Sequence, residues 1–226
     1  MKHKTNTFSV SLLFMAVFIC FAGACKKEEN DQMTVTDIDG NVYGVVKIGY
    51  QYWMLENLKT SRYNDGTSIP TGLSNAAWGA ATNGAYSIYE NDASNDTTYG
   101  KLYNWYAVNS GKLAPAGWHI PSDAEWTVLT DFLGGLAVAG GNMKSVAGWK
   151  VPNTGATNNS GFTGLPAGYR NYIGQFKDIG SYGFFWSSNE DDTDNAWHRD
   201  LRYNYSGAGK FSDYKEGGFS VRCVRN

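Results

Sequence analysis

Few residues in this chain could act as nucleophiles or as catalytic bases. Its cysteines are Cys20, Cys25 and Cys223. Cys223 lies alone in an alternating apolar segment, where a thiol behaves as a small core side chain, so we expect it to be structural. His119 and His198 lie far apart in the sequence, and neither has a nucleophile signature beside it. These observations predict a protein that is not an enzyme.

Two polar runs, residues 91–96 and 190–194, are rich in carboxylate and amide groups. Calcium prefers oxygen ligands of this kind. Neither run follows the EF-hand spacing, so we weigh a calcium site at Glu190, Asp192 and Asp194 against a solvated loop, and we favour the loop. Calcium is therefore the one cofactor that the sequence leaves open.

An aromatic segment carries the residue types that bind sugars. Sugar rings stack on aromatic faces and form hydrogen bonds with amide and guanidinium groups. The alternative is that its two tryptophans are core side chains, and that alternative stays open. We expect the segment to form long surface loops, which carry ligands in many folds. The candidate ligand-binding residues are Trp186, Asn189, Trp197, Arg199 and Tyr203.

The chain begins with a predicted secretory signal peptide, residues 1–24. Two lysines precede an apolar stretch centred on residues 12–19, and Ala22-Gly23-Ala24 stands directly before Cys25. The apolar stretch is shorter than the roughly 20 residues of a transmembrane helix. The small-small-Cys ending resembles a lipobox, which implies that Cys25 is diacylated and becomes the new amino terminus. The alternative is ordinary secretion with a free Cys25.

Residues 25–36 are predicted to form a lipidated cysteine and its flexible tether. No apolar residue stands between positions 26 and 32, so this run cannot pack and stays solvated. Its lysine followed by Glu28 and Glu29 resembles the export signal of surface lipoproteins in the Bacteroidota. This resemblance implies an outer-membrane lipoprotein exposed at the cell surface, with the membrane as its first partner.

The mature chain is acidic and cannot form a disulfide within itself. Removal of the signal takes away two lysines and no acid, leaving 17 cations against 21 acids, a net charge of about −4. A chain without a basic patch is not predicted to bind nucleic acid. With Cys25 lipidated, Cys223 is the one remaining thiol, so neither a disulfide nor a zinc cluster is expected.

Glycine-rich turns divide the remaining sequence into short elements. Residues 35–48 read as a hairpin around an Asp-Gly-Asn turn, and residues 52–54 start another strand. Residues 66–98 read as a loop, which is the second place to seek a ligand surface if the aromatic segment is core. Residues 218–224 alternate between apolar and polar types, as in a half-buried strand.

Two helices are predicted near the middle of the chain. Residues 99–109 show a helical apolar spacing. A second helix begins at Ser122, which forms a capping box with Glu125, and it ends at two consecutive glycines. Because Glu125 is used in the cap, we reject a glycosidase pair formed from Glu56, Glu125 and Glu190, since such carboxylates must also lie roughly 5–10 Å apart.

The ordered motifs along residues 37–226 resemble the Fibrobacter succinogenes major paralogous domain family. The resemblance includes a Leu-Tyr-Asn-Trp-Tyr-Ala-Val run and a Gly-Trp-His-Ile-Pro-Ser-Asp-Ala-Glu-Trp run. It implies a domain of secreted and surface proteins without an established activity. The matching segments are residues 43–49, 53–58, 63–66, 99–108, 115–126, 161–162, 165–170, 185–188 and 218–225.

A second resemblance bears on the fold. Residues 119–126 look like the Arg-Leu-Pro-Thr-Glu-Ala-Glu-Trp motif of the formylglycine-generating enzyme superfamily, and residues 218–223 look like its Gly-Phe-Arg-Cys ending. This resemblance implies an α+β, C-type lectin-like fold: short antiparallel sheets, two helices, long loops, and a final strand able to pair with the first. The oxidase chemistry of that superfamily needs a second cysteine or copper-binding thiols, which this chain lacks.

Together these patterns predict a surface-anchored lipoprotein with a non-catalytic binding domain for a glycan or protein ligand. The alternative is an enzyme of the formylglycine-generating type with lost or unrecognised chemistry. A deep cleft with convergent titratable groups would favour the enzyme, and an aromatic platform would favour the binding protein.

Overall fold

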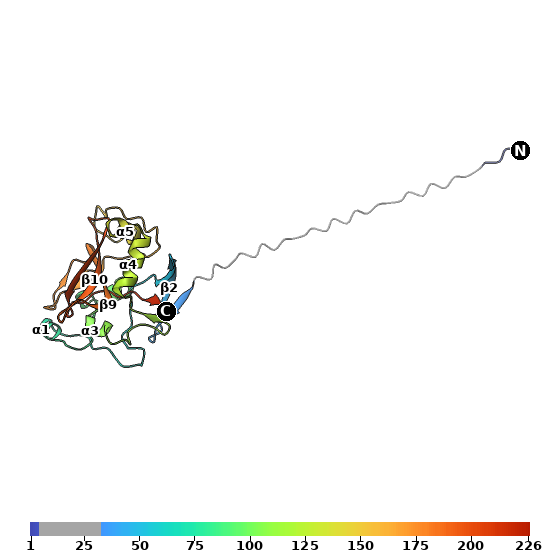
Figure 1. Cartoon of the computed structure of the whole chain (residues 1–226). Helices are drawn as coiled ribbons and strands as arrows, with labels where there is room; N and C mark the ends of the chain where they lie inside the picture. Colours follow the sequence, from blue (N-terminus) through green and yellow to red (C-terminus); the bar gives the residue numbers. More distant parts are fainter. Residues whose placement is uncertain (5–32) are drawn as a thin grey trace. The chain divides into compact units, whose positions relative to one another are not determined.

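The computed structural model describes residues 1–4 and 33–226 (Figure 1). The predicted signal peptide, the lipid site at Cys25 and most of the tether lie outside the described residues. The described residues 33–226 belong to one compact unit. Within the described ranges, none of the helices has the length and apolar character needed to cross a bilayer.

A five-stranded sheet holds both the N-terminal hairpin and the C-terminus. Its strand order is β1-β2-β3-β12-β6. The predicted hairpin is confirmed, since β1 and β2 pair antiparallel. The final strand pairs with β3 and β6, so the expected pairing with the first strand is wrong. The strands are β1 (Thr34–Thr36), β2 (Val42–Ile48), β3 (Gln51–Met54), β6 (Trp118–His119) and β12 (Val224–Arg225).

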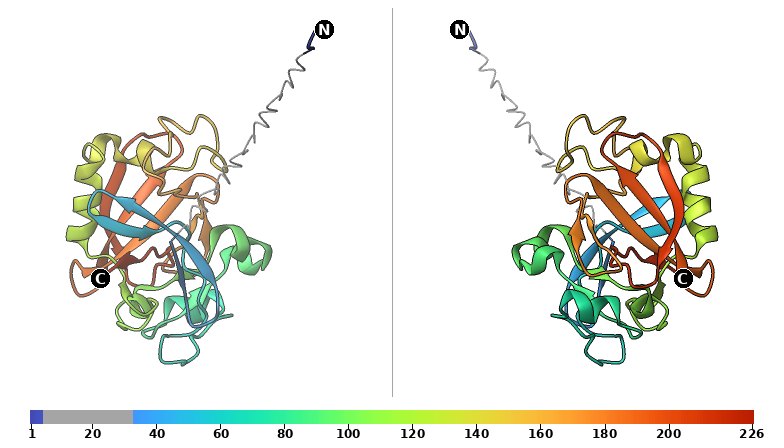
Figure 2. Two further views of the ribbon diagram at one scale, coloured as in Figure 1. Left: turned by 90° about the vertical axis from the view of Figure 1, so that its right-hand side faces the viewer. Right: turned by 90° about the vertical axis from the view of Figure 1, so that its left-hand side faces the viewer.

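A three-stranded antiparallel sheet lies where loops were expected. Its order is β11-β10-β9, and β9 and β10 span most of the aromatic segment. Helices α4 and α5 cover one face of this sheet (Figure 2). The expectation of long surface loops between residues 186 and 205 is therefore wrong. The strands are β9 (Tyr182–Glu190), β10 (Asn195–Arg202) and β11 (Ala208–Tyr214).

The capped helix is confirmed as α4 (Asp123–Phe132). The Ser122 hydroxyl accepts a hydrogen bond from the Glu125 amide, and the Glu125 carboxylate accepts one from the Ser122 amide at 2.8 Å. Two glycines with positive φ end α4, as expected, but a further helix, α5 (Leu136–Met143), follows directly. The sequence reading missed α5, because its glycines and lack of a side-chain cap hide a helical pattern.

The helix expected over residues 99–109 is wrong. Gly100 has φ 72°, and a β-carbon there would lie 2.9 Å from the Leu58 carbonyl oxygen, so the chain turns sharply at this point. Residues 99–109 instead contain the end of α2, strand β5 and helix α3. The loop predicted at residues 66–98 contains α1, β4, η1 and most of α2. These elements are α1 (Asn75–Gly79), β4 (Tyr86–Ser87), η1 (Tyr89–Asn91), α2 (Ser94–Tyr99), β5 (Leu102–Tyr103) and α3 (Trp105–Val108).

The last residues of the chain run through the middle of the domain. All positions from Gly218 to Val224 are buried, so the expected alternation of inward and outward side chains is wrong. Ser220 and Arg222 can be buried because both form hydrogen bonds inside the domain. The fold is α+β, with few helices and several short antiparallel sheets. The smallest sheets are β4–β5 and β7–β8, the latter formed by β7 (Tyr169–Arg170) and β8 (Phe176–Lys177).

Candidate functional site

Trp186, the first of the candidate ligand-binding residues, lies in the core. Its ring is fully buried and stacks on Phe219 with a centroid distance of 4.1 Å. The indole N–H donates to the Tyr103 carbonyl oxygen at 2.8 Å. A side chain with no exposed surface cannot stack on a ligand, so Trp186 is a core residue.

Arg199 and Asn189 fix the start of helix α4. The buried Arg199 guanidinium donates to the Asp123 carboxylate at 2.7 Å, and the Asp123 amide donates to the Asn189 side chain at 2.8 Å. Lys210 donates to the other Asp123 oxygen at 2.7 Å. Burial alone would raise the pKa of Asp123, but hydrogen bonds from Lys210 and Arg199 hold it below its usual value. These contacts are structural.

Trp197 and Tyr203 are partly exposed and make separate contacts. The Lys210 ammonium stands 5.0 Å from the centre of the Trp197 ring, a cation–π contact. The Tyr203 carbonyl oxygen accepts a hydrogen bond from the Thr154 amide at 2.8 Å. The five aromatic-segment residues therefore do not form one ligand surface.

The acidic run after β9 surrounds a lysine. The Lys215 ammonium donates to the Glu190 carboxylate at 2.9 Å and to the backbone oxygens of Asp192 and Thr193 at 2.9 and 2.7 Å. The Asp192 carboxylate accepts hydrogen bonds from neighbouring amides, while Asp194 gives its carbonyl oxygen to the Lys215 amide. The Lys215 ammonium thus occupies the Glu190 carboxylate and two backbone oxygens of the run, and among the described residues Glu190, Asp192 and Asp194 do not gather into a group that could hold a metal ion.

The remaining candidates for chemistry serve separate structural contacts. Glu125 accepts hydrogen bonds from Ser122 and lies 2.7 Å from the His119 ring, and Glu56 accepts from the Gly44 amide at 2.9 Å. His198 is buried among aromatic rings, and burial lowers its pKa to about 3, so the ring is neutral at physiological pH.

Cys223 is fully buried, and this burial raises the pKa of its thiol far above neutral pH. A protonated, inaccessible thiol cannot act as a nucleophile or bind a metal. Among the described residues, no three side chains of Asp, Glu, His and Cys gather into a group that could hold a metal ion.

A polar cleft of about 470 Å³ lies between the turn that contains Tyr63 and the segment that follows α3. We call it the tyrosine cleft, because the rings of Tyr63 and Tyr106 line it. Hydroxyl, amide and charged groups line the rest. The polar lining residues are Asp65, Thr67, Thr82, Asn83, Asn109, Ser110 and Lys112.

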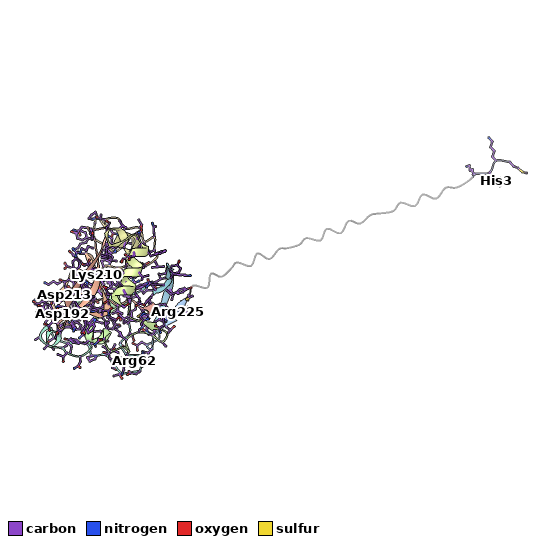
Figure 3. The ribbon with its side chains drawn as sticks, viewed as in Figure 1. His3, Arg62, Asp192, Lys210, Asp213 and Arg225 are labelled. Atoms are coloured by element: carbon purple, nitrogen blue, oxygen red, sulfur yellow. The ribbon has the colours of Figure 1, made fainter. Side chains whose placement is uncertain are left out.

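A tight turn presents Tyr63 to the cleft. The Tyr63 amide donates to the Thr67 carbonyl oxygen at 2.8 Å, and the Thr67 amide donates to the Asp65 carboxylate at 2.9 Å. The Lys112 ammonium donates to Asp65 at 2.8 Å and ties the turn to the opposite wall. Arg62 anchors the turn to Asp39, and Figure 3 shows Arg62 at the margin of the domain.

Asn104 joins the two walls of the cleft. Its buried side-chain oxygen accepts from the Ala107 amide at 3.1 Å, which caps α3, and from the Ala85 amide at 2.8 Å. Its side-chain nitrogen donates to the Asn83 carbonyl oxygen at 2.8 Å. One amide group therefore satisfies three backbone groups from two segments, and it fixes Asn83 relative to Tyr106.

Gly84 forms the floor beneath Tyr63. A β-carbon at this position would lie 2.0 Å from the Tyr63 hydroxyl oxygen and 2.9 Å from Cα of Ala107. Only glycine therefore allows the Tyr63 ring and α3 to approach each other this closely.

The cleft is electrically balanced at neutral pH. The hydrogen bond from Lys112 holds the pKa of Asp65 well below its usual value, so the two side chains carry opposite charges. Burial, followed by the hydrogen bond to Glu216, raises the pKa of Tyr106 to about 12. Burial and the charge of Asp65 raise the pKa of Tyr63 as well. Both phenols therefore stay protonated, and the Tyr106 hydroxyl donates its proton to Glu216.

A shallower apolar groove of about 280 Å³ adjoins the cleft. The two hollows share Thr82, Asn83 and Gly84 in their linings. Small apolar side chains form the rest of the groove, mainly Pro70, Leu73, Ala77, Ala80, Ala81 and Ala85.

The fold and this cleft define a mixed α+β domain that carries a polar, tyrosine-lined cleft at its surface. The chain belongs to the Fibrobacter succinogenes major domain family, whose model matches residues 46–225. This match confirms the family resemblance of the sequence. No curated protein and no solved structure matches the chain.

The residues of the first candidate ligand surface do not lie on one exposed surface, and the second candidate segment, residues 66–98, contributes part of the cleft. Thr67, Thr82, Asn83 and Gly84 all lie within residues 66–98. A further signal was present in the Leu-Tyr-Asn-Trp-Tyr-Ala-Val run, where an asparagine directly precedes a short helical pattern and can cap it.

Proposed function

We propose that this protein is a cell-surface lipoprotein, anchored through Cys25, that binds a neutral glycan in the tyrosine cleft. The observation that carries the proposal is the composition of the cleft: two tyrosine rings beside exposed hydroxyl and amide groups, with a single balanced pair of charges. The fully buried Cys223 gives no support to the alternative of a formylglycine-generating type of enzyme.

The chemistry of a sugar matches this lining. The C–H face of a pyranose ring stacks on an aromatic ring, and its hydroxyl groups bond with amides and phenols. The side chains of Thr82, Asn83 and Asn109 are exposed at the cleft and available to such a ligand. A volume of about 470 Å³ lies within the usual range of small-molecule sites.

The finer assignment of the fold is also a proposal. The N-terminal hairpin and the last strand share one sheet, and helices α4 and α5 pack beside a second sheet. This arrangement supports a C-type lectin-like fold of the formylglycine-generating superfamily, in which long connections carry the ligand. Here the connections at residues 61–85 and 106–113 line the cleft.

Replacing Tyr106 with alanine should weaken glycan binding about two- to tenfold. The change removes one stacking surface, and an aromatic contact contributes roughly 0.5–1.5 kcal/mol. Tyr106→Phe keeps the ring and should retain most of the affinity. Binding is measured on an array of neutral oligosaccharides and then by titration with the strongest hit.

Tyr214→Ala is the matched control, because Tyr214 is an exposed tyrosine that is absent from the lining of the cleft. It should bind as the unchanged protein does. If Tyr106→Ala and Tyr63→Ala both keep full affinity while their melting temperatures are unchanged, the cleft is not the glycan site.

Replacing Cys25 with serine should release the protein from the membrane. Serine offers no thiol for acylation, and several acyl chains are what give stable anchoring. Fractionation after labelling with a fatty acid measures this. A Cys25→Ser protein that stays in the membrane pellet and still takes up label would contradict the anchoring. Cys223→Ser serves as the control and should remain in the membrane fraction.

A further inference from the structure

We propose that the end of the domain formed by the β2–β3 turn, α4 and α5 rests on the lipid surface, so that the tyrosine cleft points away from the membrane. The inference rests on the proposed anchoring at Cys25 and goes beyond it, because it assigns a second membrane contact and an orientation to the folded domain.

This end of the domain exposes large apolar side chains that a soluble surface would bury. Tyr50, at the β2–β3 turn, is 95% exposed, and Phe132, on the last turn of α4, is 61% exposed. The two are neighbours, because the Phe132 ring packs on Gly49 closely enough to lie 3.0 Å from a β-carbon placed there. We call this surface the apolar end, and its exposed residues are Tyr50, Val128, Phe132, Leu136 and Val138.

Helix geometry gathers these residues on one side of α4. Val128 and Phe132 are four positions apart, so their side chains lie one above the other on the same face of α4. The Gln51 side chain donates to the Glu125 carbonyl oxygen at 3.1 Å, which holds the start of β3 beside the same helix. Tyr50 therefore extends an apolar stripe that α4 begins.

The charges near the apolar end suit an anionic lipid surface. Asp131 is exposed beside Phe132, but the sequence has no Asp or Glu from residue 132 to residue 177, a stretch that includes α5 and the long connection after it. This acid-free stretch includes the exposed cation Lys150. A second exposed cation, Lys47, lies on β2 beside the ring of Tyr52. Aromatic and basic side chains together are what proteins place at the headgroup level of a bilayer.

The described residues before β2 are directed toward this end. The Val45 amide donates to the Met33 carbonyl oxygen at 2.9 Å, and β1 runs antiparallel to β2. Going backwards from Thr34, the chain therefore points toward the end of β2 that carries Tyr50. Cys25 stands nine positions before Thr34, a distance of at most about 30 Å at roughly 3.3–3.6 Å per residue.

The tyrosine cleft lies at the opposite end of β2. Its turn is tied to the β1–β2 connection, because Ser61 and Arg62 both donate to the Asp39 carboxylate. Asp39 precedes Val42 at the start of β2, whereas Tyr50 follows Ile48 at its end. Figure 1 shows the same arrangement, with α4 and α5 at the upper end of the domain and α1 and α3 at the lower end.

The test uses the mature lipidated protein in vesicles of phosphatidylethanolamine and phosphatidylglycerol. A polarity-sensitive fluorophore is attached in the variants Tyr50→Cys and Thr67→Cys, which place it at the apolar end and at the cleft. Labelling is specific because Cys223 is fully buried and the thiol of Cys25 carries lipid. We expect lipid-borne quenchers to reduce the Tyr50→Cys emission at least twofold more than the Thr67→Cys emission.

Two further variants test the orientation of the domain separately from its anchoring. Adding Phe132→Asp to Tyr50→Cys should reduce the extra quenching, whereas adding Tyr172→Asp, at an exposed tyrosine outside the apolar end, should not. If the protein floats with the vesicles but both positions are quenched equally, the orientation is wrong and the anchoring stands. If the protein does not float, the anchoring is wrong and the orientation falls with it.

Discussion

Replacing Arg222 with methionine is expected to destabilise the domain by about 4 kcal/mol or more, a large part of the stability of a typical domain. Arg222 is fully buried, and its guanidinium donates four hydrogen bonds, all to uncharged oxygens. The acceptors are the Asn57 side chain and the backbone oxygens of Met54, Phe162 and Thr163, at distances from 2.7 to 3.0 Å.

The size of this effect follows from what methionine leaves behind. Each buried acceptor without a partner costs roughly 1–3 kcal/mol, and methionine satisfies none of them. Burial lowers the pKa of Arg222 to about 9, which still leaves the group charged at neutral pH, where it interacts with the ring of Phe162 at 4.5 Å. The loss therefore includes a cation–π contact as well as four hydrogen bonds.

Urea unfolding of Arg222→Met beside Arg225→Met measures the effect. Arg225 is exposed and lies three positions later in the chain, so its replacement should cost well under 1 kcal/mol. Equal midpoints for the two variants would show that the buried guanidinium does not hold β3, the loop at Phe162 and the C-terminal segment together.

Replacing Trp186 with alanine is expected to cost about 3–5 kcal/mol of stability, the usual range for losing a buried tryptophan. Its ring stacks on Phe219 and its indole N–H donates to the Tyr103 carbonyl oxygen, and alanine loses both contacts. The cavity left behind would lie between β9 and the buried C-terminal segment, where surrounding backbone cannot readily collapse.

Trp197→Ala is the matched control on the neighbouring strand. Trp197 is partly exposed, and its main specific contact is the ammonium of Lys210, a contact type that contributes roughly 0.5–1 kcal/mol at exposed sites. Thermal melting should therefore separate the two variants by several degrees or more. A larger loss of stability for Trp197→Ala than for Trp186→Ala would contradict the assignment of Trp186 to the core and of Trp197 to the partly exposed surface.

The parts of the fold that the sequence predicted correctly are those with a local cause. The capping box needs only Ser122 and Glu125, three positions apart, and the first hairpin needs only the turn around Gly40. In both cases the residues that predict the element are also the residues that form it. Its formation therefore does not depend on residues far away in the sequence.

The sequence predictions fail where contacts between residues far apart in the sequence determine the structure. Strands β9 and β10 do not alternate in a readable way, because helices cover one face of their sheet and the C-terminal segment contacts the other. Arg222 looks like an outward-facing polar residue until its four buried acceptors are known. The tyrosine cleft likewise depends on Asn104 and Gly84, whose roles appear only when segments far apart in sequence meet.

The buried ammonium of Lys215 has a consequence for how the domain responds to its surroundings. The connection between β9 and β10 is closed by a cation that is covalently part of the chain, and which is therefore always present at a high effective concentration. The shape of this connection is consequently indifferent to chelators and to the divalent-ion content of the medium. The loop therefore keeps the same shape in media of different ionic composition.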